Sequence, residues 1–179
     1  NFGVDITIQD CVTAGNGGGI QVDSGGAFTF ENAAVCRNNQ AGGTGGAVNA
    51  FQATVTFGNT AEFTNNTSGG IGGAVFAHRA TFTFGNTAEF TGSKVTDAVG
   101  GAVAIFESEM IFRSSATFTR NDVDDALMGR GAAAFVKSFG SSNSSMTVEG
   151  LLTLSENTCG GMTCDVSSSS SRIICFSQM

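Results

Sequence analysis

Two eleven-residue segments of this 179-residue chain are almost identical. Residues 54–64 read TVTFGNTAEFT and residues 81–91 read TFTFGNTAEFT, so 10 of 11 positions match at an offset of 27 residues. A repeat of this length is one supersecondary unit that cannot bury its apolar face alone, so it must stack on its neighbours. The repeat therefore constrains the fold more than any other feature of the sequence.

A glycine motif recurs in the same frame. It begins, at intervals of 27 to 31 residues, at Gly17, Gly45, Gly72, Gly100, Gly131 and Gly160. The three clearest copies read GGAV, and their second glycines are Gly46, Gly73 and Gly101. Glycine permits positive φ angles and close approach of two backbones, so we expect these motifs at the corners of stacked coils.

Apolar residues fall into columns when the repeats are aligned on the glycines. Val55 and Phe57 alternate with Thr54 and Thr56, which is the period of a strand. The four columns are Ile20, Val48, Val75, Val103 and Ala134; Phe28, Val55, Phe82, Met110 and Met146; Phe2, Phe30, Phe57, Phe84, Phe112 and Val148; and Ile8, Val35, Phe63, Phe90, Phe118 and Leu154. This pattern predicts an all-β parallel β-solenoid of about six coils, with three short strands per coil.

The coils are expected to occupy residues 1–163, followed by a cap or linker over residues 164–179. The chain starts at Asn1 without a signal-peptide pattern, so we expect a processed or excised piece of a longer product. The sequence also begins in the middle of a coil, because Phe2 already belongs to one of the four apolar columns. Strand edges at a solenoid end are unpaired unless something covers them. We therefore expect further chain or a protein partner at the N-terminal end.

The composition narrows the classes of partner. The chain contains 16 Phe but no Tyr or Trp, the aromatic residues that usually stack on sugars, so we interpret the Phe residues as buried stacks. Only 13% of residues are charged and the net charge is −7, which argues against nucleic acid as a partner. No apolar run approaches the roughly 18–20 residues of a membrane-spanning helix.

An F-x-x-N motif occurs at Phe63 with Asn66 and at Phe118 with Asn121. Asparagine tolerates the left-handed backbone conformation and forms hydrogen bonds with nearby backbone groups. The sequence therefore assigns Asn65 and Asn66 a structural role at a corner.

Together, the G-G-A-[ILV] and F-x-x-N motifs resemble the repeats of the chlamydial polymorphic membrane proteins and similar right-handed parallel β-helix proteins. The weaker F-x-x-N matches are Val35 with Asn38 and Leu154 with Asn157, and the resemblance covers roughly residues 2–163. It implies a right-handed coil and a surface-displayed domain that adheres to other surfaces. The chain departs from the pattern after Phe90, where Gly92 and Ser93 follow.

Five cysteines suggest disulfides. Cys11 and Cys36 fall near each other on successive coils, so a bridge between them is expected if their Cα atoms lie within about 7 Å. Cys159, Cys164 and Cys175 cluster near the C-terminus, where one pair could staple the cap. The alternative is that the cysteines are buried free thiols. Because the number of cysteines is odd, at least one thiol stays unpaired within the chain.

The sequence predicts neither a metal site nor a cofactor. Asp122, Asp124 and Asp125 could gather around calcium, but they lack the regular spacing and closing Glu of a calcium loop. They are expected to form a solvated corner. Cys159 and Cys164 have no nearby His and lack zinc-ligand spacing.

Catalysis would require paired carboxylates on one face, as in the β-helix enzymes that cleave polysaccharides. Asp5, Asp10 and Asp23 lie in the first coils, but Arg37 is the only basic residue nearby. The single histidine, His78, is expected at the surface at a strand end. We therefore predict no enzymatic activity, with a polysaccharide lyase or hydrolase as the alternative.

Two surface chemistries remain as alternatives. The outward pairs Thr54/Thr56 and Thr81/Thr83 raise the possibility of an ice-binding face, although the neighbouring coils interrupt the threonine array. Asn65, Asn66 and Asn143 match the N-glycosylation pattern, which matters only in a eukaryotic secretory context.

The function predicted from the sequence is a noncatalytic structural or adhesive β-solenoid, secreted or exposed on a cell surface. It would bind partners through flat faces, corner loops or open ends. The other candidates are a polysaccharide-processing enzyme, an accessory subunit docked on a larger assembly, and an ice-binding solenoid.

Overall fold

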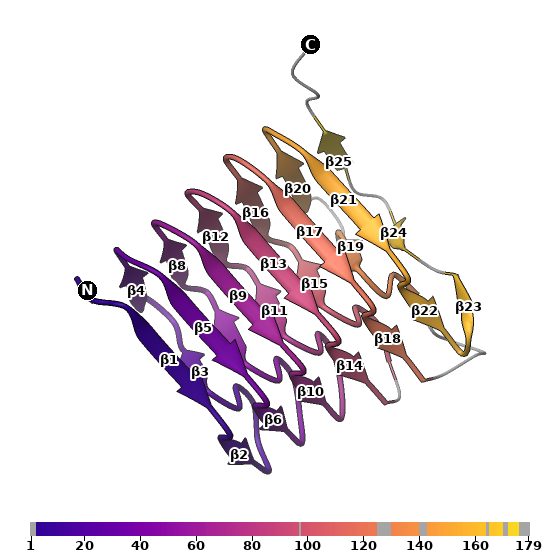
Figure 1. Ribbon diagram of the computed structural model, residues 1–179, viewed down its shortest axis with the longest axis horizontal. Coiled ribbons are helices and arrows are strands. Elements are labelled where there is room, and N and C mark those ends of the chain that lie inside the picture. Colours follow the sequence, from indigo (N-terminus) through magenta and orange to yellow (C-terminus); the bar gives the residue numbers. More distant parts are fainter. Residues whose placement is uncertain are drawn as a thin grey trace.

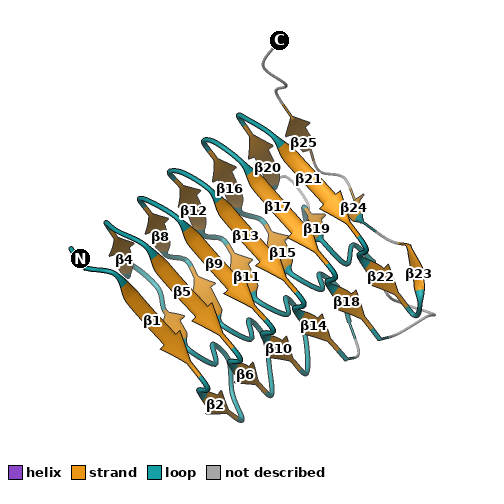
Figure 2. Ribbon diagram, viewed as in Figure 1, coloured by secondary structure: helices purple, strands orange, loops and turns teal. Residues whose placement is uncertain are grey.

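A computed structural model shows a stack of β-coils in which strands of successive coils lie side by side (Figure 1). It describes residues 3–96, 98–124, 130–139, 143–163, 165–169 and 172–175. Within these ranges the regular structure consists of strands and contains no helix (Figure 2). All strand pairs are parallel except one pair near the C-terminal end. The predicted fold class, an all-β parallel solenoid, is confirmed.

Four sheets form the walls of the solenoid, and the chain visits them in the order I, II, III, IV within each coil. Sheet I contains β1 (Ile6–Gln9), β5 (Ala34–Arg37), β9 (Ala61–Thr64), β13 (Ala88–Thr91), β17 (Ala116–Thr119) and β21 (Leu152–Ser155). Sheet II contains β2 (Val12–Thr13), β6 (Gln40–Ala41), β10 (Thr67–Ser68), β14 (Lys94–Val95), β18 (Asp122–Val123), β22 (Thr158–Cys159) and β23 (Met162–Thr163).

The other two sheets are built in the same way. Sheet III contains β3 (Ile20–Val22), β7 (Val48–Phe51), β11 (Val75–His78), β15 (Val103–Phe106), β19 (Ala134–Lys137) and β24 (Val166–Ser169). Sheet IV contains β4 (Ala27–Phe30), β8 (Thr54–Phe57), β12 (Thr81–Phe84), β16 (Glu109–Phe112), β20 (Ser145–Val148) and β25 (Arg172–Cys175). Because β24 and β25 join sheets III and IV, the segment after residue 163 extends the stack.

The sequence predicted three strands per coil, whereas the structure has four. The strands of sheet II, such as Thr67–Ser68, have only two residues, and no period-2 pattern can develop over that length. They form because Thr67 pairs with Gln40 on one side and with Lys94 on the other. The pairing is therefore set by the stack and not by local strand propensity.

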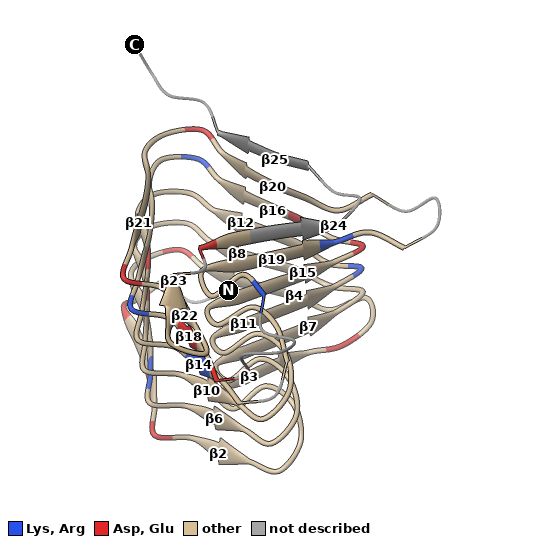
Figure 3. Cartoon of the chain, turned by 90° about the vertical axis from the view of Figure 1, so that its right-hand side faces the viewer, with Lys and Arg blue, Asp and Glu red and all other residues tan. Residues whose placement is uncertain are grey.

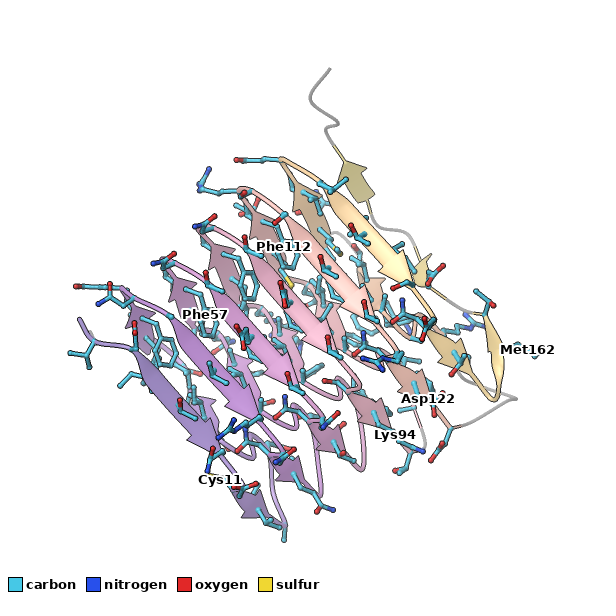
Figure 4. All side chains as sticks on the ribbon, viewed as in Figure 1. Cys11, Phe57, Lys94, Phe112, Asp122 and Met162 are labelled. Atoms are coloured by element: carbon cyan, nitrogen blue, oxygen red, sulfur yellow. The ribbon has the colours of Figure 1, made fainter. Side chains whose placement is uncertain are left out.

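Stacked phenylalanine rings fill the interior. Phe84 of sheet IV lies 5.1 Å from Phe57 and 4.7 Å from Phe112, measured between ring centroids, and these rings are nearly parallel. Phe63 and Phe90 of sheet I stack in the same way at 4.7 Å. The two stacks meet edge to face, and Figure 4 shows Phe57 and Phe112 between the sheets. The predicted in-register column of Phe30, Phe57, Phe84, Phe112 and Val148 is confirmed, whereas Phe2 lies outside the described residues.

The predicted column of sheet I contains one error of register. Ile8 pairs with Cys36, and Cys36 pairs with Phe63, so Cys36 and not Val35 belongs to the buried column. Cys36 is fully buried, whereas Val35 faces outward beside Glu62. The repeat at this point is one residue longer than the alignment assumed. The correct F-x-x-N equivalent is therefore Cys36 with Asn39.

A ladder of buried asparagines follows the sheet I column. Asn39, Asn66, Asn121 and Asn157 are completely buried. Each side-chain amide donates to the carbonyl of the preceding coil, as Asn66 Nδ2 does to the Cys36 oxygen at 2.9 Å. Their Oδ1 atoms accept bonds from the neighbouring coil, as in the 3.1 Å bond from the Asn39 backbone N–H to Asn66 Oδ1. The F-x-x-N motif thus satisfies buried backbone groups where the chain turns from sheet I to sheet II.

The asparagine ladder is interrupted at Ser93. Its hydroxyl is buried without a hydrogen-bond partner, although its backbone N–H donates to Asn121 Oδ1 at 3.0 Å. Serine is too short to span the gap to the Phe63 carbonyl as an asparagine amide would. An unsatisfied buried hydroxyl costs about 1–3 kcal/mol.

Replacing Ser93 by asparagine is therefore expected to raise the free energy of unfolding by about 1–2 kcal/mol, because two ladder bonds would form and the unpaired hydroxyl would be removed. Urea denaturation of wild type, Ser93→Asn and the control Ser93→Ala measures the effect. The control removes the hydroxyl without restoring the ladder, so it should gain less. A destabilised Ser93→Asn variant would contradict the ladder interpretation.

The second glycines of the G-G-A motifs stack where sheet II turns into sheet III. A Cβ atom on Gly46 would lie 2.1 Å from the Gly73 carbonyl oxygen, and one on Gly73 would lie 2.0 Å from the Gly101 oxygen. The first glycines, Gly45 and Gly72, have positive φ angles of 64° and 70°. Both glycines of the motif are therefore required by backbone geometry, as the sequence predicted.

Candidate functional site

Charged residues are concentrated at the turns and strand ends of the solenoid, and most strands contain none (Figure 3). The outward side of sheet III differs from the other faces because it is aromatic. Val75 and Ala77 of β11 point into the core, so Phe76 and His78 point outward. We call the outward residues Phe51, Phe76, His78, Phe106 and Phe135 the aromatic face.

The rings of the aromatic face contact one another across neighbouring coils. Ring centroids of Phe51 and His78 lie 5.2 Å apart, and those of Phe76 and Phe106 lie 5.5 Å apart. Phe106 also contacts Phe135 at 5.7 Å. Phe51, Phe76 and Phe106 are partly exposed. The result is a continuous apolar strip that runs along the solenoid axis outside the core.

One end of the aromatic face is covered by the chain itself. Phe139, which follows β19, stacks on Phe106 with ring centroids 5.8 Å apart, and the Lys137 ammonium lies 4.6 Å from the centre of the Phe139 ring. Phe135 is only 4% exposed although it points away from the core. Phe139 is itself 44% exposed, so this second layer ends in an apolar surface.

The expectation that the Phe residues form buried stacks is correct for the core and wrong for this face. Composition could not separate the two groups, because it does not say which residues of a strand point inward. The alternation of side chains along each strand contains this information. In the strands VNAF, VFAH and VAIF the first residue is the inward valine, so the third residue also points inward and the second and fourth point outward. This alternation would have identified Phe51, Phe76 and Phe106 as outward residues.

Sheet IV carries the threonine pairs that the sequence raised as an ice-binding face. Thr81 pairs with Thr54 and Thr83 pairs with Thr56, so the two T-x-T pairs lie side by side on adjacent coils. The next coil places Glu109 and Ile111 in these rows. The threonine array is therefore in register but two coils wide, with Thr29 extending one row.

The acidic corner of sheet II contains a lysine. Lys94 Nζ lies 2.6 Å from Asp124 Oδ1 and 3.6 Å from Asp122 Oδ2, and Figure 4 shows Lys94 and Asp122 on adjacent coils. The hydrogen bond that the Lys94 ammonium donates to the Asp124 carboxylate raises the pKa of Lys94. An ammonium group thus occupies the position between the carboxylates, and Asp125 lies outside the described residues. In the ranges described, no three His, Cys, Asp or Glu side chains gather as metal ligands.

The carboxylates considered for catalysis are engaged in separate contacts. Asp5 Oδ1 accepts from the Ala33 N–H at 3.1 Å, and Asp10 Oδ1 accepts from Asn38 Nδ2 at 3.0 Å. Asp23 Oδ1 accepts from Gln21 Nε2 at 3.0 Å. The contacts of these carboxylates are hydrogen bonds that tie coils or turns together.

His78 lies at the end of β11, as expected. Its Nε2 atom is 3.9 Å from Glu107 Oε2, and Arg79 Nε donates to the same oxygen at 2.5 Å. The histidine therefore lies beside the Arg79–Glu107 ion pair at the end of β11.

Cys11 and Cys36 are free thiols, so the expected bridge between them is not formed. The Cys11 thiol donates to the Gln9 carbonyl oxygen at 3.3 Å, whereas Cys36 occupies the core column of sheet I. Burial raises the pKa of the Cys36 thiol to about 12. A protonated, buried thiol is a packing group and a poor nucleophile.

The C-terminal cysteines are described only in part. Cys159 is disulfide-bonded and 5% exposed, and no disulfide joins two of the described cysteine side chains. Cys164 and the side chain of Cys175 lie outside the described residues.

The glycosylation candidates differ in accessibility. Asn66 is fully buried in the asparagine ladder, so its amide is not available to a modifying enzyme in the folded chain. Asn65, with a φ of 53°, and Asn143 are exposed.

The N-terminal end of the described stack presents four strand edges. β1, β2, β3 and β4 are each the terminal strand of their sheet. Ile6, Ile8 and Phe28 of these strands pack on the core but remain partly exposed. At the other end, β23 pairs antiparallel with β22 and leaves Met162 65% exposed (Figure 4).

Comparisons with protein-family models, with curated proteins and with solved structures give no match. Among the described residues, no apolar helix has the length needed to cross a lipid bilayer. The structure supports the solenoid part of the family resemblance, and the specific family stays a proposal. Of the surfaces described above, the aromatic face is the one whose composition departs most from an ordinary solvated sheet.

Proposed function

We propose that the chain is a noncatalytic structural or adhesive β-solenoid, secreted or displayed on a cell surface, that binds its partner through the aromatic face. The observation that carries this proposal is the contiguous cluster of Phe51, His78, Phe76 and Phe106 on the outside of sheet III. The largest apolar patch on the surface of a monomeric protein is often an interaction site. Aromatic side chains also supply much of the binding energy of interfaces.

The solenoid suits display because it is stiff and regular. Each coil is tied to the next by parallel strand pairs in four sheets and by the phenylalanine stacks. A binding face on such a support loses little conformational freedom when a partner docks, which favours affinity. The disulfide at Cys159 supports an oxidising location, because disulfides persist outside the cytosol.

The proposal includes a second contact at the N-terminal end. The edges of β1 to β4 offer unpaired backbone groups to a further parallel coil, contributed by more chain or by a protein partner. The partly exposed Ile6, Ile8 and Phe28 would then be buried.

The experiment compares beads coated with wild type, with Phe76→Ser/Phe106→Ser and with the control Thr54→Ser/Thr81→Ser, which alters the outward side of sheet IV. The beads are applied under flow to a surface coated with the wild-type protein, to cultured animal cells, to chitin and to cellulose. Retention of wild-type and control beads on at least one surface, with loss of the Phe variant, supports adhesion through the aromatic face. No retention on any surface, or equal retention of all three proteins, would contradict it.

A further inference from the structure

One row of outward residues on sheet III is nearly symmetric about its centre. β3, β7, β11, β15 and β19 pair in register, so Phe51, His78, Phe106 and Lys137 stand in one row along the solenoid axis. Val22 pairs with Ala50, so Asp23, the next residue, extends the row beside Phe51. The row reads Asp, Phe, His, Phe, Lys. His78 is at the centre of the row and has one phenylalanine on each side. The two ends of the row are an aspartate and a lysine, which carry opposite charges.

We propose that the partner of the aromatic face is a second copy of this chain, packed face to face with the two solenoid axes antiparallel. The two-fold axis of this dimer runs parallel to β11 and lies between the two facing sheets. Rotation about this axis reverses the order of the coils in the second copy. Each row of outward residues then faces the same row of the other copy. Asp23 then lies opposite Lys137 of the other copy, Phe51 opposite Phe106, and His78 opposite His78. Such an interface is isologous, because the same patch is used on both copies.

The second outward column has a partly exposed phenylalanine, Phe76, at its centre, whereas its residues Asn49, Ala104 and Phe135 are buried within the chain. It reads Gln21, Asn49, Phe76, Ala104 and Phe135 along the same five strands. The two-fold axis pairs Phe76 with Phe76 of the other copy, at the centre of the interface. Aromatic residues at the centre and charged residues at the rim are the usual arrangement of a protein interface.

The size of the face implies a weak dimer. Five strands spaced about 4.8 Å apart and four residues at about 3.3 Å each give a face of about 19 Å by 13 Å. This is smaller than the roughly 800 Å² per partner that a standard stable interface buries. The Asp23–Lys137 pairs would then chiefly select the antiparallel arrangement, since rim charges contribute more to specificity than to affinity.

The inference names the partner of the face described under the proposed function and so rests on it. Sedimentation equilibrium from about 10 µM to about 1 mM tests it directly. The variants are Asp23→Lys, Lys137→Asp, the double swap Asp23→Lys/Lys137→Asp, and the control Glu62→Lys. The control makes the same charge change as Asp23→Lys on sheet I. Circular dichroism shows that each variant is folded.

Wild type and the control are expected to dimerise with similar Kd. Each single swap places like charges opposite each other twice, so it should raise Kd about tenfold or more. The double swap should restore the wild-type Kd. An equimolar mixture of the two single variants should form a heterodimer, because a chain with two lysines then faces a chain with two aspartates.

Three outcomes would overturn the inference: wild type that is monomeric at every concentration, a dimer whose Kd changes equally in the swaps and the control, and a mixture of the single variants that associates no better than either variant alone. These results are separable from failure of the proposed function. Beads that adhere to cells through the aromatic face while the protein stays monomeric would retain the adhesive role and reject the second copy as partner.

Discussion

Replacing Gly73 by alanine is expected to lower the free energy of unfolding by about 3–5 kcal/mol. The new Cβ would lie 2.0 Å from the Gly101 carbonyl oxygen, 2.7 Å from the Lys94 backbone nitrogen and 2.8 Å from the Lys94 oxygen. All three atoms belong to the backbones of the adjacent coil, so no side chain can rotate away. Relief requires the coils to separate, which weakens strand pairing along sheets II and III.

The matched control is Gly15→Ala, at a position in the same kind of corner. Its Cβ would meet only Thr13 Oγ1, at 3.7 Å, which is ordinary van der Waals contact. This variant should lie within about 0.5 kcal/mol of wild type. Urea denaturation followed by far-UV circular dichroism measures both variants. Equal stabilities of the two would show that the coils are not in close backbone contact at Gly73.

Truncating Phe84 to alanine is the second change for which we expect a loss of about 3–5 kcal/mol. Phe84 is completely buried and lies at the centre of its stack, between Phe57 and Phe112, with Phe63 and Phe90 at its edge. The variant leaves a cavity that the flanking rings cannot fill, because their strands are held in register on both sides.

Phe76→Ala on the aromatic face provides the comparison for Phe84→Ala. Phe76 points outward and contacts Phe106 and His78, so its loss should cost no more than about 1–1.5 kcal/mol in the monomer. Thermal and urea unfolding of the two variants at low protein concentration gives the difference. A larger loss for Phe76→Ala than for Phe84→Ala would invert the assignment of inner and outer phenylalanines.

The sequence was sufficient for the fold wherever a column repeats one residue type. Phe30, Phe57, Phe84 and Phe112 are identical at one phase, and identical side chains on parallel strands stack only when the strands are in register. The prediction failed at Cys36, because a cysteine and a neighbouring valine both fit a buried column. Only the pairing with Ile8 and Phe63 decides between them.

The candidate site was not predicted, for a physical reason. A phenylalanine in a sheet that encloses a core can point inward or outward, and total composition gives no weight to either direction. The alternation around Val75 and Val103 contains that information, but it must be read strand by strand. The second layer formed by Phe139 and the match between Asp23 and Lys137 depend on the register of five strands, which no local pattern specifies.

The central claim is that equivalent residues of successive coils lie directly beside one another in one continuous stack. Nuclear Overhauser contacts across the strands Thr54–Phe57 and Thr81–Phe84 test this claim most directly. We predict contacts between the backbone protons of Val55 and Phe82, and between the ring protons of Phe57 and Phe84, whose centroids lie 5.1 Å apart. Contacts shifted by one or more residues, or no contact between these two rings, would contradict the account.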